Sequence, residues 1–133
     1  MNSRPLLAAC TLALSVAGSV AAQTAEPDFA AGAEEYRVAC AACHGEAAGG
    51  NGPIATMFQG GVPDLTGLAA RNDGIFPLTD VVQMIDGRLE VRAHGNPMPV
   101  FGNRYAAASG PDGENMVRLK VLELTYYLNS IQE

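Results

Sequence analysis

The stretch Cys40-Ala41-Ala42-Cys43-His44 decides how the rest of the sequence is interpreted. It ends a segment rich in alanine and glutamate that predicts a helix. Cysteines three positions apart on a helical turn point to the same side, and the next residue projects beneath them. Two thiols and an imidazole are therefore expected to face one common object.

A Cys-x-x-Cys-His sequence is the attachment motif for covalent haem, because the thiols reach two vinyl groups on one porphyrin edge and the imidazole binds the iron. A thioredoxin-like dithiol shares the cysteine spacing, but it requires strands, and no alternating strand pattern is present. A structural zinc site needs four ligands, and His94 is the only other histidine. We therefore predict one haem c, held covalently by Cys40 and Cys43, with His44 as proximal iron ligand.

The first residues have the form of a secretory signal peptide. Arg4 precedes an uncharged apolar run over residues 5–20, and small residues lead to a cleavage site after Ala22. The run is short for a membrane span, and Cys10 is interpreted as an ordinary residue of this segment. We predict a cleaved signal peptide over residues 1–22, a single domain over 23–133, export to the periplasm, and no membrane insertion after cleavage.

The charge balance excludes one class of partner. The chain has 14 acidic and 8 basic residues, a net charge of −6, and Lys120 as its single lysine. Phosphate backbones require clustered basic charge, so nucleic acid is not an expected partner. An acidic carrier instead favours a partner with a basic or apolar face.

The remaining sequence predicts an all-α fold of three or four helices joined by long Gly/Pro loops. Asp28 is expected to cap the helix that ends near Ala42, and Thr79 is expected to cap a helix that ends at Gly87. Apolar residues recur at helical spacing from Asn115 to Gln132. Aromatic residues make up only 6% of the chain, so a large apolar cofactor at the centre would supply the bulk that the core lacks.

A sixth iron ligand is expected opposite His44, and methionine and histidine are the candidates. Met98 lies in a loop between two prolines, which restrict backbone freedom and make a weak thioether bond less costly to form. His94, four residues earlier, is the rival, and an iron with an open site is the third possibility. The other methionines, Met57 and those inside predicted helices, are interpreted as packing residues. The sequence favours Met98.

These motifs together resemble the class I bacterial cytochromes c, which are mono-haem proteins, over nearly the whole chain after residue 22. The resemblance implies that Gly32 and Tyr36 cross the last helix at Tyr127, and it matches Met98-Pro99 to the axial Met-Pro of the family. It also implies that a Gly-Pro after the haem motif, here Gly52-Pro53, supplies a carbonyl to the proximal histidine. The stretch 104–114 departs from a minimal member of the family and is expected to be a surface excursion, either specific for a partner or neutral.

The resemblance implies an electron carrier, not an enzyme, that cycles Fe(III)/Fe(II) between a donor dehydrogenase and an acceptor oxidase or reductase. It would act as a monomer or as a subunit of a complex. A permanent haem c subunit of a larger dehydrogenase or oxidase is the alternative, and an open-iron enzyme or gas sensor is a less favoured one. Contact through an exposed haem edge is expected, with the candidate residues Ala41, Ala42, Pro53, Ile54, Val100 and Phe101. Candidate partners for the haem propionates are Arg71, Arg88, Arg92 and Arg104.

Overall fold

The structure, a computed structural model, describes residues 28–88 and 98–133. Within these ranges it contains helices and no strands, as predicted for an all-α fold. The α-helices are α1 (Ala30–Ala39), α2 (Ala41–His44), α3 (Leu78–Asp86), α4 (Phe101–Ala108) and α5 (Gly113–Ser130). Three short 3₁₀ turns connect them: η1 (Ala55–Met57), η2 (Ala70–Asn72) and η3 (Gly110–Asp112). None of the helices in this part of the chain has the length and apolar character needed to cross a bilayer. The predicted signal peptide lies outside the described residues.

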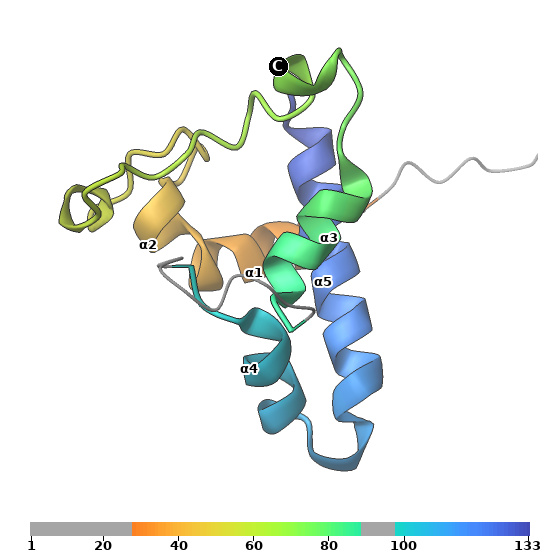
Figure 1. The fold of residues 1–133 in the computed structure, drawn as a ribbon. Helices are drawn as coiled ribbons and strands as arrows, with labels where there is room; N and C mark the ends of the chain where they lie inside the picture. Colours follow the sequence, from red (N-terminus) through yellow and green to blue (C-terminus); the bar gives the residue numbers. More distant parts are fainter. Residues whose placement is uncertain (1–27, 89–97) are drawn as a thin grey trace, which may run out of the picture.

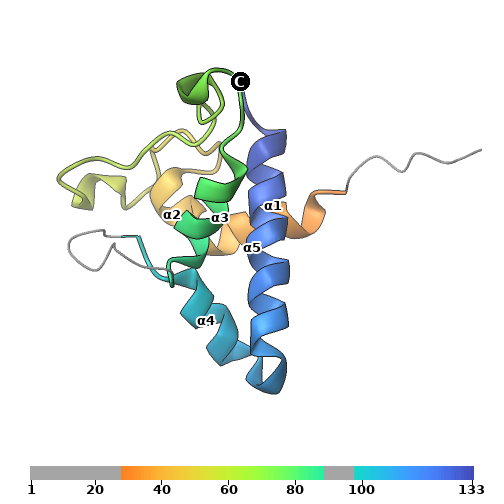
Figure 2. The same cartoon turned by 45° about the vertical axis from the view of Figure 1, so that its right-hand side comes forward.

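Helices α1 and α5 cross at a glycine, and this contact sets the architecture (Figures 1 and 2). A Cβ atom on Gly32 would overlap the backbone carbonyl of Glu123 and lie 2.8 Å from Cβ of Tyr127, so only glycine allows this approach. Four residues on, Tyr36 is buried, and its ring centroid lies 5.4 Å from that of Tyr127. The predicted contact of glycine and tyrosine with the last helix is confirmed.

Helix α5 supplies the largest share of the core. It begins at Gly113, two residues before the predicted start, and ends at Ser130. Four of the five predicted apolar positions are buried along it: Val117, Val121, Leu124 and Leu128. The fifth, Ile131, follows the last residue of the helix and is half-buried. Helices α1, α3 and α4 all pack against α5, which is therefore the common spine of the fold.

The ends of the other predicted helices are partly corrected. The N-cap of α1 is Phe29, so the predicted cap at Asp28 is wrong by one residue, although the Asp28 carboxylate accepts a hydrogen bond from the backbone N–H of Ala30 at 2.9 Å. Thr79 lies inside α3, which begins one residue earlier, and the predicted cap there is wrong. Gly87 ends α3 in a left-handed conformation with φ 68°, as predicted for a glycine after a helix.

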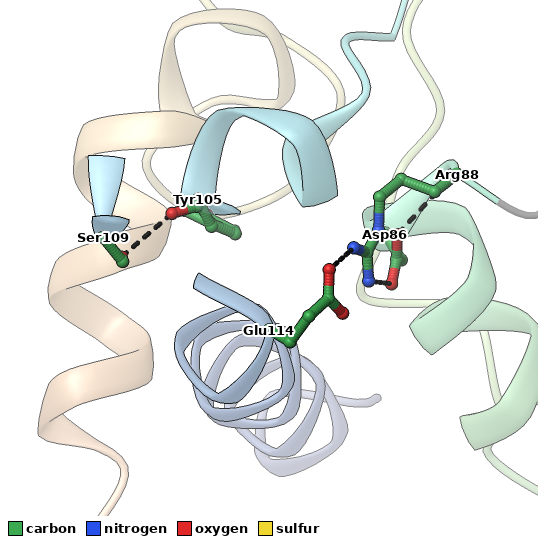
Figure 3. Close-up of polar contacts among 5 residues, drawn as sticks. All are labelled: Asp86, Arg88, Tyr105, Ser109 and Glu114. Atoms are coloured by element: carbon green, nitrogen blue, oxygen red, sulfur yellow. Dashed lines mark hydrogen bonds and ion pairs between the residues drawn. The ribbon is translucent and has the colours of Figure 1, made fainter. Parts of the chain in front are cut away.

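The stretch 104–114 is not a surface excursion. Residues 101–108 form α4, and Gly113 already belongs to α5. Phe101 and Tyr105, one helical turn apart, are both buried, and their rings stack at 6.0 Å. Ser109 ends the helix, and its hydroxyl donates to the carbonyl of Tyr105 at 2.9 Å (Figure 3). The small residues of α4 form a helix because its two aromatic side chains, Phe101 and Tyr105, lie on one buried face.

The long loop between α2 and α3 is fastened to the far end of the chain. The side chain of Gln132 donates to the carbonyl of Leu65 and accepts from the N–H of Ala69, each at 2.9 Å. The N–H of Glu133 donates to the carbonyl of Thr66 at 3.0 Å. Figure 1 shows this loop returning to the C-terminal end of α5, so the loop forms a wall beside the helical layer.

Candidate haem site

The cysteine motif lies at the junction of α1 and α2. Cys40 ends α1, and the short α2 follows at once, with the N–H of His44 bonded to the carbonyl of Cys40 at 2.9 Å. Gly45 then reverses the chain at φ 86°, a conformation that a side chain would oppose. Cys40, Cys43 and His44 all line the same cavity, as the helical spacing predicted.

The imidazole of His44 is held in one orientation by the chain. Its Nδ1 lies 3.0 Å from the carbonyl oxygen of Pro63. A carbonyl can only accept, so Nδ1 must carry the proton, and Nε2 keeps its lone pair for a metal. Burial lowers the pKa of His44, which favours the neutral ring that metal binding requires.

Pro63, not Pro53, supplies that carbonyl, so the prediction based on Gly52-Pro53 is wrong. Pro53 is exposed, and its neighbours bond elsewhere. The N–H of Gly52 donates to Cys43 and that of Ile54 to Ala42, each at 3.1 Å, so this segment packs against the backbone of α2.

A turn signal after Pro63 was available in the sequence. Asp64 Oδ1 accepts from the N–H and the hydroxyl of Thr66, at 2.8 and 2.7 Å, which bends the chain directly after Pro63. The sequence alone does not show that this turn faces the imidazole.

The cavity has a volume of about 450 Å³ and a mostly apolar lining. Its walls come from α2, the loop between α2 and α3, α3 itself and the start of α4. Helix α5 contributes Leu128. The apolar and loop residues that line it are Phe58, Gly61, Val62, Pro63, Leu65, Leu68, Pro77, Val81, Ile85, Pro99 and Phe101. Such a space suits a flat apolar group with few polar attachments.

Two methionines line the cavity. Met98 lies in its wall beside Pro99, and Met84 reaches it from α3. Met57 is 76% exposed, so the expectation that it packs inward is wrong. His94, the other candidate for the second iron ligand, lies outside the described residues.

The two thiols are not joined in a disulfide. Burial, reinforced by the nearby charge of Glu35, raises the pKa of Cys40 to about 12. Burial therefore favours the protonated form of the Cys40 thiol. Within residues 28–88 and 98–133, no group of three or more His, Cys, Asp and Glu side chains is placed to hold a metal ion by itself.

The candidate arginines differ in their position relative to the cavity. Arg71 lines the cavity, and its guanidinium also donates to the carbonyl of Asp64. Arg88 is occupied by ion pairs away from the cavity, and Arg104 lies 6.0 Å from the ring centroid of Phe101. Arg92 lies outside the described residues.

The predicted exposed edge needs one correction. Ala41 and Phe101 are 8% and 3% exposed and cannot form a contact surface. Ile54 and Val100, at 37% and 41%, are exposed, as are Ala42 and Pro53.

This arrangement defines a class of protein: an all-helical chain that presents two adjacent thiols and a metal-ready imidazole to one apolar cavity. The described residues fit a covalently bound haem, since the cavity is apolar and the tautomer of His44 leaves Nε2 able to bind iron. The family model for cytochrome c matches residues 29–117, and the chain belongs to that family. Its fold is the class I cytochrome c fold, and its cofactor is one covalent haem c with its iron. No curated protein and no solved structure matches the chain.

Membership of the family establishes haem-based electron transfer as the broad function. Proteins with this domain are typically electron carriers rather than enzymes.

Proposed function

We propose that this protein is a periplasmic mono-haem electron carrier with a six-coordinate iron. The observation that carries the proposal is that Cys40, Cys43, His44 and Met98 all line one apolar cavity. When bound, the haem supplies a one-electron Fe(III)/Fe(II) couple. The residues of the chain attach this group and orient it.

The cysteines attach the cofactor and the histidine orients it. Cys40 and Cys43 would hold the haem through thioether bonds, so that its position would not depend on affinity. The carbonyl of Pro63 accepts from Nδ1 of His44, which leaves Nε2 able to bind iron and would raise the basicity of that ligand.

Met98 is proposed as the second ligand. A thioether ligand would raise the reduction potential relative to a second imidazole, and the apolar lining would add to this, because both disfavour the higher charge of Fe(III). Pro99 restricts the backbone directly after it.

Arg71 is the arginine proposed to pair with a haem propionate. Among the candidate arginines that the structure describes, it is the one that lines the cavity, and its bond to the carbonyl of Asp64 fixes the guanidinium there. A guanidinium held in this way can still offer donors to a carboxylate.

The donor and acceptor are proposed to be a dehydrogenase and a terminal oxidase or reductase in the same compartment. The predicted signal peptide supports this location. One observation favours the alternative of a permanent subunit: Leu119, Leu122 and Tyr126, on one side of α5, are 50%, 41% and 49% exposed. A permanent subunit would elute with its partner, and a free carrier as a monomer, when native periplasm is fractionated by size.

The covalent assignment is tested with the variant that carries Cys40→Ala and Cys43→Ala. We expect acid–acetone extraction to leave haem on the wild-type protein and to leave none on the double variant. Arg37→Ala, a surface change on α1, serves as the control that keeps its haem. Retention of haem by the double variant after extraction would disprove the attachment.

The ligation is tested by spectroscopy. Ferric wild-type protein should show the long-wavelength charge-transfer band of methionine-bound iron, and the ferrous protein should bind carbon monoxide slowly. Absence of the band together with rapid carbon monoxide binding would instead support an open-iron enzyme or sensor.

A further inference from the structure

The residues on either side of Met98's segment meet at one point of the fold. Gly87, just after α3, lies so close to Val100 that an added Cβ would be 3.3 Å from its Cα. A Cβ on Gly102 would lie 2.6 Å from Nε of Arg88. We call this contact between residues 86–88 and 100–102 the neck. Met98 is two residues from it.

The Arg88 side chain packs over Gly102 at the neck and is held there by three hydrogen-bonded ion-pair contacts to Asp86 and Glu114 (Figure 3). Its Nε and Nη2 donate to the two carboxylate oxygens of Asp86, at 2.6 and 3.0 Å, which is a bidentate pair. Its Nη1 donates to Glu114 at 2.6 Å. Because Glu114 lies in the first turn of α5, the same guanidinium ties the neck to the spine of the fold.

The pair at the neck is better shielded than an ordinary surface ion pair. The side chains of Arg88 and Asp86 are 27% and 18% exposed, whereas those of Arg37 and Glu34 are 66% and 62% exposed. Partial burial and bidentate geometry both strengthen such a contact. None of Asp86, Arg88 and Glu114 lines the cavity.

We propose that Arg88 is a positioning residue for the ligation of iron by Met98. This inference rests on the proposed role of Met98. A thioether–iron bond is weak, so the equilibrium between bound and released methionine depends on the entropy lost when its backbone is ordered. The guanidinium, held by Asp86 and Glu114, lies against Gly102 and restricts the backbone that leads to Met98, which lowers that loss in advance.

The experiment uses the complete holoprotein with Arg88→Ala, Arg88→Lys and the control Arg37→Ala. Displacement of the methionine by imidazole is followed by loss of the ferric charge-transfer band. In Arg88→Ala we expect about tenfold tighter apparent imidazole binding, the size that loss of one charge-assisted pair produces. Lysine cannot form the bidentate contact and should give an intermediate shift. Arg37→Ala should leave the affinity unchanged.

A structural role alone is distinguished by measuring imidazole binding in a Met98→Ala background, where binding is followed by the shift of the Soret band because no methionine is bound to give a charge-transfer band. There Arg88→Ala should leave the imidazole affinity within about twofold of the parent, because no methionine remains to be positioned. Equal shifts in both backgrounds, or none in either, would overturn the inference.

Glu114→Gln keeps the proposal testable if Arg88→Ala does not fold. Its side chain is 64% exposed, and the change removes the negative charge from one arm of the network while an oxygen that can accept from Arg88 remains. It should shift the affinity in the same direction, by about threefold. If the wild-type protein lacks the methionine band, the proposed ligation itself fails, and that outcome is separate from a failure of Arg88.

Discussion

Replacement of Gly32 by alanine tests the crossing of α1 and α5. An added Cβ would overlap the carbonyl of Glu123 and lie 2.8 Å from both its carbonyl carbon and Cβ of Tyr127. Two of these obstacles are backbone atoms of a long helix, so the helices must separate. Overpacking of this kind costs about 3 kcal/mol, and alanine returns about 1 kcal/mol through its higher helix propensity. The net expected loss of stability is about 2 kcal/mol.

The assay is guanidinium unfolding of the ferric holoprotein, followed by far-ultraviolet circular dichroism. We expect a lower midpoint with an unchanged slope, and a melting temperature about 8 °C lower. Gly60→Ala is the matched control, because no atom lies within 4 Å of the Cβ that it would add and its φ is not positive. A Gly32→Ala variant as stable as the Gly60→Ala control would refute the packing argument.

Three further changes have defined outcomes. Met98→Ala should keep the haem attached and raise the rate of carbon monoxide binding to the ferrous protein by at least about tenfold, as measured by flash photolysis; an unchanged rate would count against ligation. Tyr36→Phe removes a buried 2.7 Å hydrogen bond to the carbonyl of Gly45, which keeps its 3.1 Å bond from Ala48, so chemical unfolding should show a loss of about 1 kcal/mol and no more than 2. The bond from Arg88 lowers the pKa of Asp86 below its ordinary 3.8, so this group stabilises the fold above that value and loses its contribution as the pH falls through the lower folded pKa. The stability difference between wild type and Asp86→Asn, measured by urea titration, should therefore shrink below about pH 4; a constant difference would contradict this.

The sequence was most informative at positions where the geometry of a helix allows few residue types. Gly32 and Tyr36 are spaced for one helical face, and the crossing that they predict is present. The haem motif predicted that two thiols and an imidazole share a side, and all three line the cavity.

It was least informative where a role depended on contacts distant in the chain. Both Pro53 and Pro63 follow the motif in a glycine-rich loop, and only the fold shows which carbonyl reaches His44. Helix α4 was missed because its alanines resemble a surface loop, whereas the burial of Phe101 and Tyr105 against α5 decides the structure. The same burial explains why Phe101 is not part of an exposed edge.

The tie between Gln132 and the loop has a consequence for the order of assembly. Its contacts to Leu65 and Ala69 span 67 and 63 positions of sequence, whereas α2 is held by bonds between near neighbours. Contacts that close long loops are entropically costly and form late in folding. We therefore expect the thiols to be presented on α2 while the opposite wall is still open, which gives a bulky ring a route in. When Gln132 then bonds to the loop, that wall of the cavity is in place. We therefore expect the haem to be attached before the last long-range contacts form.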